Sequence, residues 1–303
     1  MKRAAQFLVV LTVLALVVAM AGCGGGGTDG AQMATAKKPE PSPPPSPAYN
    51  VVELAPVSGD YSVAYDINSS GQVAGYWIDD SNVRHSFVWD ADAGIAELSG
   101  FAGNNYAMDI NDNGAVVGAA TFAGGTHAYL WENGSVTDLG TLAGRARSSA
   151  TSINNAGQVV GVATDDTLRS PLAWIWSASG GMAELGALLG GDESRAEAIS
   201  DAGRVTGWSL LTGSSVRHAF LWADGAAAVD LGTLADPTEL YRSEGYALSE
   251  SSAAVQVVGA SQDGSNASAF VWQDGVMTAL PLPKKSQGTT AADISGQGDI
   301  VGW

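Results

Sequence analysis

Short runs of alternating apolar and polar residues, separated by Asn, Asp and Gly, recur along the chain from about residue 48 to its end. Each run has the length of a β-strand, and the segments between the runs are too short for helices. In the best-defined stretch the predicted strands, which we name a to d in chain order, cover 150–154, 158–162, 172–176 and 182–185. Asn154 to Gly157 and Glu132 to Gly134 have the residues that tight antiparallel turns require. The pattern predicts units of four antiparallel strands.

The same unit returns every 43 to 50 residues. Its a–b hairpin ends in Gly and occupies 66–75, 109–118, 152–161, 198–207, 248–259 and 293–302. Its strand c ends in Trp and occupies 85–89, 127–131, 172–176, 218–222 and 268–272. Strand d follows at 97–98, 138–140, 184–186, 230–232 and 279–280. A fixed period of this size predicts an all-β fold, a β-propeller of about six blades, with the aromatic residues of strand c between blades. A β-solenoid is the weaker alternative, because its coils usually repeat over fewer residues.

The ends of the repeat region indicate a closed ring. Residues 51–54 read as a strand d with no a, b or c before it, and 292–302 form a hairpin with no c or d after it. Pairing these segments would remove two exposed edges, so we expect the N-terminal strand to close the last, incomplete blade. Two interpretations stay open: a sixth blade of three strands, or a chain shortened at Trp303.

The N-terminus has the layout of a secretory signal over residues 1–22. A basic start is followed by an apolar stretch at 7–20 and by small residues directly before Cys23. Met20-Ala21-Gly22-Cys23 resembles the bacterial lipobox, which implies cleavage before Cys23 and lipidation of its thiol. Gly24 follows where Asp favours retention in the inner membrane, so we expect a lipoprotein of the outer membrane or cell surface. An ordinary cleaved signal, giving a secreted protein, is the alternative.

Residues 23–47 are rich in Gly and Pro and predict an extended tether, which leaves 48–303 as the propeller domain. The chain has a net charge of −17 and one cysteine. The negative charge repels phosphate backbones and argues against a nucleic-acid partner. One cysteine excludes disulfides within the chain and metal sites built from several cysteines.

Motifs for catalysis are missing from the sequence. His85, His127 and His218 are the only histidines, and each stands four residues before a strand-c Trp. Because the repeat places them on different blades, we interpret them as structural rather than as a shared metal site or relay. The sequence also lacks a P-loop, a His-Glu-x-x-His motif and a Gly-x-Ser-x-Gly motif with a plausible triad. We therefore predict no cofactor and do not expect an enzyme.

One stretch matches the start of a calcium loop. Asp109, Asn111 and Asn113 precede Gly114 at the right spacing, but the twelfth position is Ala120, which cannot supply the bidentate carboxylate. We interpret these residues as turn formers and keep calcium as the weaker alternative.

The a–b and c–d turns are short, whereas the b–c and d–a loops vary and should emerge on one face of the ring. Variable loops on a rigid scaffold are the expected recognition surface. The candidate ligand-binding residues are Tyr61, Trp77, Tyr106, Arg147, Arg195, Trp208, Tyr241 and Arg242.

The phrases at 218–222 (His-Ala-Phe-Leu-Trp) and 230–234 (Asp-Leu-Gly-Thr-Leu) resemble those of the HAF-repeat family of probable bacterial extracellular proteins. The resemblance spans 51–303 and departs at Leu172 and Ser268, where the signature His is replaced. It implies secretion and supplies no catalytic residues. We predict a lipid-anchored binding or surface-scaffold module that recognises a glycan or protein ligand. An enzyme acting on envelope or extracellular polymers, and a repeat fragment without function, are the alternatives. The pattern leaves the ligand and the oligomeric state open.

Overall fold

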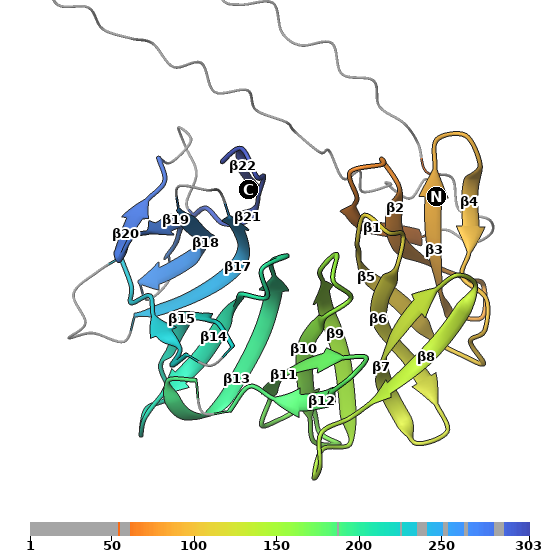
Figure 1. Ribbon diagram of the computed structural model, residues 1–303, viewed down its shortest axis with the longest axis horizontal. Helices are drawn as coiled ribbons and strands as arrows, with labels where there is room; N and C mark the ends of the chain where they lie inside the picture. Colours follow the sequence, from red (N-terminus) through yellow and green to blue (C-terminus); the bar gives the residue numbers. More distant parts are fainter. Residues whose placement is uncertain are drawn as a thin grey trace, which may run out of the picture. The chain divides into compact units, whose positions relative to one another are not determined.

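The computed structural model describes residues 54, 61–186, 188–224, 226–234, 241–250, 254–263, 266–281 and 288–303. These residues form five four-stranded antiparallel sheets and one two-stranded sheet (Figure 1). The predicted all-β fold of about six blades with an incomplete last blade is therefore confirmed. Within the described residues no helix is long and apolar enough to span a membrane.

We number the sheets as blades 1 to 6 in chain order. Blade 1 contains β1 (Tyr61–Ile67), β2 (Val73–Ile78), β3 (Arg84–Asp90) and β4 (Gly94–Glu97). Blade 2 contains β5 (Asn105–Ile110), β6 (Val116–Phe122), β7 (Gly125–Glu132) and β8 (Ser135–Gly140). Blade 3 contains β9 (Arg147–Ile153), β10 (Val159–Thr164), β11 (Leu172–Ser177) and β12 (Gly181–Glu184).

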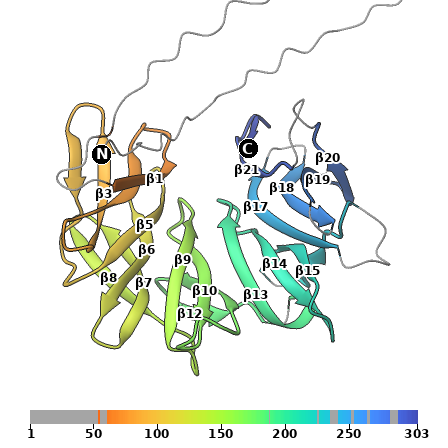
Figure 2. The ribbon, with the colours of Figure 1, turned by 180° about the vertical axis from the view of Figure 1, so that it is seen from behind.

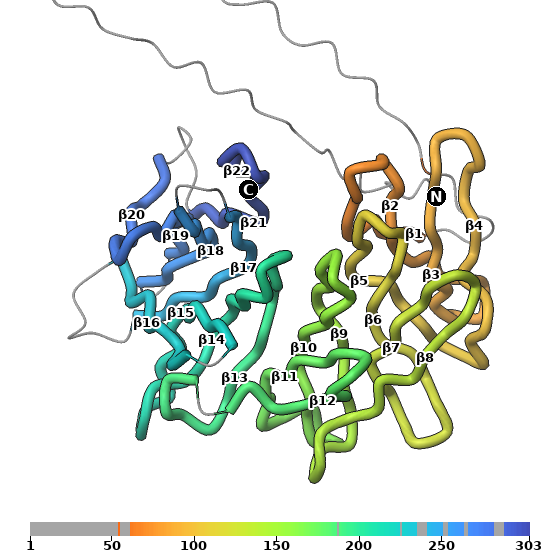
Figure 3. The backbone as a smooth tube through the Cα atoms, viewed as in Figure 1, coloured from red at the N-terminus to blue at the C-terminus, as the bar shows by residue number. Residues whose placement is uncertain are grey.

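Blade 4 contains β13 (Gly190–Ile199), β14 (Val205–Leu211), β15 (Arg217–Trp222) and β16 (Val229–Asp230). Blade 5 contains β17 (Arg242–Glu250), β18 (Val255–Asp263), β19 (Asn266–Gln273) and β20 (Val276–Ala279). Blade 6 contains β21 (Ala291–Ile294) and β22 (Ile300–Gly302). Each blade is complete before the next begins, as the tube in Figure 3 shows.

Consecutive blades lie next to one another (Figure 2). Buried apolar side chains pack between them. One buried cluster joins Val117 and Leu130 of blade 2 to Ala150 and Val159 of blade 3, with Trp174 fully buried among them. The strand-c position of Trp174 is filled in the other complete blades by the fully buried Phe87, Tyr129, Phe220 and Phe270. The prediction that the aromatic residues of strand c form the core between blades is confirmed.

The glycine that ends every a–b hairpin is required by close packing of strands a and b. Strands a and b shift register near the middle of strand a, for example between Ala107 and Asp109. At the same place in blade 3, a Cβ on Gly161 would overlap the carbonyl oxygen of Ser149. The equivalent Gly118 meets the carbonyl of Tyr106 in the same way. Only glycine lets the backbones approach this closely, which explains its return in every repeat.

The a–b turns are bonded to one another from blade to blade. The Asn68 side-chain amide donates to the carbonyl of Asn111 at 3.1 Å, across 43 residues. Asn111 donates in turn to the carbonyl of Asn154 at 3.0 Å, and Asn154 donates to that of Ser200 at 2.9 Å. The repeating Asn of the hairpin phrase therefore ties neighbouring blades together.

All six hairpins line one cavity of about 370 Å³, from Ile67 in blade 1 to Ile294 in blade 6, which we name the central cavity. Burial, and then the charge of Asp66 in blade 1, raises the pKa of Asp293 in blade 6. The first and last hairpins therefore lie near each other, as a ring requires. The predicted closing strand at 51–54 falls outside the described residues, apart from Leu54, as do the predicted signal at 1–22 and tether at 23–47.

Candidate binding site

Four tyrosines gather where blades 1 and 2 meet. The Tyr76 ring on β2 lies 5.9 Å from that of Tyr65 and 6.4 Å from that of Tyr61, both on β1. Tyr106 on β5 meets Tyr76 edge-on at 6.3 Å. Alternate residues of a strand face the same side, so Tyr61 and Tyr65 share a face of β1, and Val63 between them pairs with Tyr76 on β2. Together with Arg84 we name these residues the tyrosine site.

Arg84 begins β3 and reaches over the tyrosine rings. Its guanidinium carbon lies 5.6 Å from the Tyr76 ring centroid and 5.9 Å from that of Tyr106. Within the described residues, the Arg84 guanidinium has no carboxylate partner. The rings thus hold a cation in place by cation–π attraction and leave its N–H groups available to an incoming acceptor.

The site presents both apolar rings and hydroxyl groups to solvent. Tyr61 is 49% exposed and Tyr65 is 47% exposed, high values for side chains of this size. Burial, and then the neighbouring Tyr76, raises the pKa of Tyr65, so its hydroxyl stays protonated near neutral pH. The Tyr106 hydroxyl lies 3.4 Å from Ser149 Oγ on blade 3. The surface can therefore pack against apolar groups and donate hydrogen bonds at once.

Of the predicted binding residues, Tyr61 and Tyr106 belong to this site, whereas Trp77 does not. Trp77 is only 5% exposed and stacks on His85 with ring centroids 4.3 Å apart. Its neighbour Tyr76 points to the opposite side of β2 and forms the centre of the site. Tyr76, Tyr65 and Arg84 were not among the predicted binding residues, and the predicted Trp77 lies on the opposite side of β2 from this surface.

Trp208 and Arg195 belong to a second, closed cluster on blades 4 and 5. Arg217 lies over the buried Trp208 ring at 3.9 Å and also pairs with Glu244 at 3.3 Å. Arg195 Nε lies 2.6 Å from Glu197. Arg217 and Trp208 occupy the positions of Arg84 and Tyr76 in their repeat, but here the cation is neutralised and the ring is covered.

Arg147 and Arg242 are exposed at the first residues of β9 and β17, and Tyr241 directly precedes β17. Among the eight predicted residues, all except Tyr241 lie inside strands rather than in variable loops. At the end of the blades where the b–c and d–a loops lie, the strands are longer than the apolar pattern indicated. The eight residues are spread over different blades and do not form one site.

The three histidines bridge strands within their own blades, as their place in the repeat indicated. Nδ1 of His85 lies 2.8 Å from Glu97, that of His127 lies 3.0 Å from Asp138, and that of His218 lies 2.9 Å from Asp230. Burial raises the pKa of Asp230, but the hydrogen bonds from His218 and from the Gly232 N–H outweigh it, so the net shift is downward.

The calcium-like stretch forms the a–b turn of blade 2. The side-chain oxygen of Asn111 accepts the N–H groups of Asn113 and Ala115, and Asn113 donates to the carbonyl of Asn155 at 3.0 Å. Asp109 accepts the N–H of Ile153 at 2.8 Å. In the part of the chain that the structure describes, no group of three or more His, Cys, Asp or Glu side chains could hold a metal ion.

No family model and no curated protein matches the chain. Among solved structures, TolB from Acinetobacter baumannii superposes with a TM-score of 0.52 at 14% sequence identity, over 77% of this chain and 56% of TolB. The chain thus spans about half the length of TolB. A triple mutant of AofleA from Arthrobotrys oligospora gives a TM-score of 0.38 at 13% identity, over 74% of this chain and 73% of AofleA. The TolB likeness and the observed sheets define the fold class as β-propeller.

Proposed function

We propose that this protein is a lipid-anchored β-propeller of the bacterial cell envelope that binds a protein ligand through the tyrosine site. The observation that carries the proposal is the group of exposed Tyr61 and Tyr65 with half-buried Tyr76 and Tyr106. Arg84 lies over these rings and has no carboxylate partner within the described residues. A cluster of aromatic rings with an available cation at the surface marks a candidate interaction site.

The residue types favour a protein ligand over a glycan. Tyr and Arg are enriched at the energetic centres of protein interfaces, where they supply large contact areas and directed hydrogen bonds. The rings lie at angles to one another, with 45° between Tyr61 and Tyr76 and 66° between Tyr76 and Tyr106. A broad surface of tilted rings suits side chains and backbone of an extended peptide, and Arg84 suits a carboxylate or carbonyl of that peptide.

The test is selection from a displayed random-peptide library, followed by affinity measurements on an enriched peptide. Tyr76→Ala and Arg84→Ala should each weaken binding by about thirtyfold or more, the scale of an interface hot spot. Arg217→Ala is the matched control, because Arg217 holds the equivalent position in the closed cluster of blade 4. It should change affinity by less than about threefold.

Absence of any enriched peptide, or equal affinity in Tyr76→Ala and wild-type protein, would refute a protein ligand at this site. Binding to an immobilised glycan that is lost in Tyr76→Ala would replace the protein ligand with a sugar.

Membership of the HAF-repeat family and attachment through Cys23 are further parts of the proposal. The repeated hairpin, the His-x-Phe-x-Trp phrase and the lipobox-like Met20-Ala21-Gly22-Cys23 support them. Lipidation would hold the propeller at a membrane surface through the Gly/Pro-rich segment at 23–47.

Cys23→Ser should move the protein from the membrane fraction into soluble material, because serine cannot accept the thioether-linked lipid. Ser42→Ala, within the same segment, should remain with membranes. Fractionation followed by immunoblotting measures both. Cys23→Ser that stays in the membrane fraction would rule out the anchor.

A further inference from the structure

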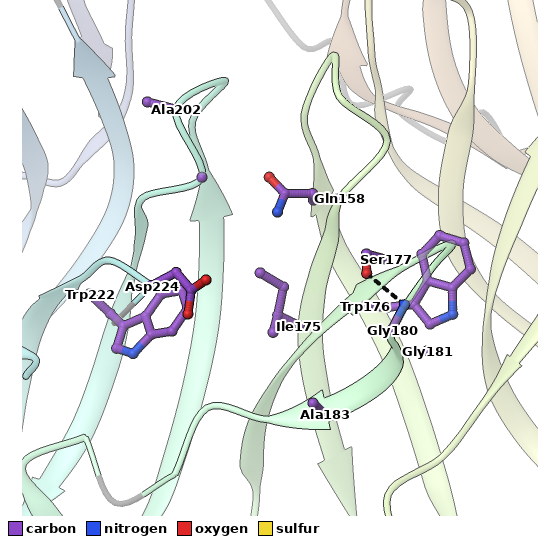
Figure 4. Close-up of a pocket in the computed structure, with 11 residues that line it drawn as sticks. Gln158, Ile175, Trp176, Ser177, Gly180, Gly181, Ala183, Ala202, Trp222 and Asp224 are labelled. Atoms are coloured by element: carbon purple, nitrogen blue, oxygen red, sulfur yellow. Dashed lines mark hydrogen bonds between the residues drawn. The ribbon is translucent and has the colours of Figure 1, made fainter. Parts of the chain in front are cut away.

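A cavity of about 390 Å³ opens between blades 3 and 4, at the end of the strands where the a–b and c–d turns lie (Figure 4). Trp222 and Asp224 of blade 4 form one side of the cavity, and Ile175 and Gln158 of blade 3 form the other. The turn segments at 180–181 and 202–203 complete its rim. The tyrosine site lies on other blades, so this cavity is a separate feature.

Small side chains on both blades leave the cavity open. Ala183 on β12 pairs with Ile175 and lines the cavity, and Ala202 lines it from the a–b turn of blade 4. Trp222 and Ile175 pack against the same buried cluster. Side chains as small as alanine leave space beside the indole.

Polar groups surround the apolar walls of the cavity. Gln158 uses its Oε1 to accept from the Asn154 side chain at 2.9 Å, and its Nε2 has no protein acceptor among the described residues. The Asp224 carboxylate likewise has no hydrogen-bond or ion-pair partner among the described residues. Ser177 Oγ accepts the Gly180 N–H at 3.1 Å and keeps its own hydrogen free to donate.

We propose that this cavity binds a neutral hexose or a single hexose unit of a longer glycan. The Trp222 ring and Ile175 would take the apolar C–H face of the sugar, because the face of an aromatic ring attracts weakly positive C–H groups. Asp224 would accept hydrogen bonds from sugar hydroxyls, and Gln158 and Ser177 would donate to them.

Size and charge both favour this ligand. The cavity falls within the range for small-molecule sites, and it combines apolar walls with a few polar groups that fix orientation. A carboxylate at the site and a chain net charge of −17 disfavour acidic sugars and phosphorylated ligands.

Saturation-transfer-difference NMR on the full protein tests the proposal with methyl glycosides of glucose, galactose, mannose and fucose, and with methyl glucuronide as an acidic probe. We expect saturation transfer to at least one neutral glycoside and none to the glucuronide. Asp224→Asn should weaken that binding by about tenfold, the cost of losing a charged acceptor. Asp274→Asn is the matched control in the c–d turn of blade 5, and it should bind as wild type.

Ala183→Met separates binding from folding. Ala183 lines the cavity from an exposed position on β12, so the variant should keep the wild-type melting midpoint while filling the cavity and abolishing saturation transfer. No transfer to any neutral glycoside, or transfer that persists unchanged in both Asp224→Asn and Ala183→Met, would overturn the proposal. Because the tyrosine site is on blades 1 and 2, these outcomes are independent of peptide binding there.

Discussion

Two carboxyl groups in neighbouring a–b hairpins, those of Asp66 and Asp109, lie close enough to interact. Asp66 accepts the N–H of Ile110 in the next blade at 3.1 Å, and Asp109 accepts that of Ile153 at 2.8 Å. Burial, and then the hydrogen bond and charge of Asp66, raises the pKa of Asp109 well above its usual value. Each carboxylate thus joins two blades.

The raised pKa of Asp109 predicts how the stability of the protein changes with pH. A carboxyl whose pKa is higher in the folded state binds more protons there, so its contribution to stability falls as pH rises from about 4 through the folded pKa. Asp109→Asn removes that loss and keeps an oxygen that can accept from Ile153. Thermal melts should show a higher midpoint than wild type near pH 7 and the same midpoint near pH 4.

Asp112 provides a control of opposite sign. Hydrogen bonds from Ser69, through side chain and backbone, and then from Asn155, lower its pKa. Its contribution is present above the unfolded pKa and is lost as pH falls, so Asp112→Asn should lower the midpoint near pH 7. A midpoint for Asp109→Asn that is unchanged or lower than wild type near pH 7 would contradict the raised pKa of Asp109.

At the scale of strands, the period of the sequence predicted most of the fold. Apolar alternation located the strands of blade 3 to within a few residues, from the predicted 158–162 to the observed β10 (Val159–Thr164). The returning Gly and Asn of the hairpin also have physical causes that a single repeat contains: a close approach of strands and a self-bonded turn.

The candidate site was predicted only in part, because its residues meet through strand register and through contacts between neighbouring blades, which the spacing of the repeat does not show. Tyr76 and Trp77 are both apolar aromatic residues on one strand, and the sequence does not state which faces the neighbouring blade. The contact of Tyr61 and Tyr65 with the Tyr76 ring depends on the register of β1 and β2, and Tyr106 approaches from the next blade. The cavity beside Trp222 was missed because its lining comes from two neighbouring blades, and the spacing of the repeat does not show which of their side chains face each other.

At the scale of the molecule, a buried apolar cluster joins each blade to the next. Blade 6 follows this rule with only two strands. Ala291 and Ile294 are buried against Ala247, Val258 and Ala269 of blade 5. The last hairpin also lines the central cavity with the other five, so it contributes to the interior of the ring as well as to its neighbour.

Removal of residues 288–303 therefore tests whether the ring is a single cooperative structure. The deletion exposes the apolar face of blade 5 and unpaired turn groups around the central cavity, so stability should fall by on the order of 5 kcal/mol and aggregation should increase. Thermal melts and light scattering of the truncated and full-length proteins measure both effects. Deletion of 39–47, in the Pro-rich segment, is the control and should leave the midpoint unchanged. In a solenoid, removal of the terminal unit destabilises only its neighbour. Equal midpoints and equal solubility after removal of 288–303 would therefore show that the stability of the blades does not depend on ring closure through this hairpin.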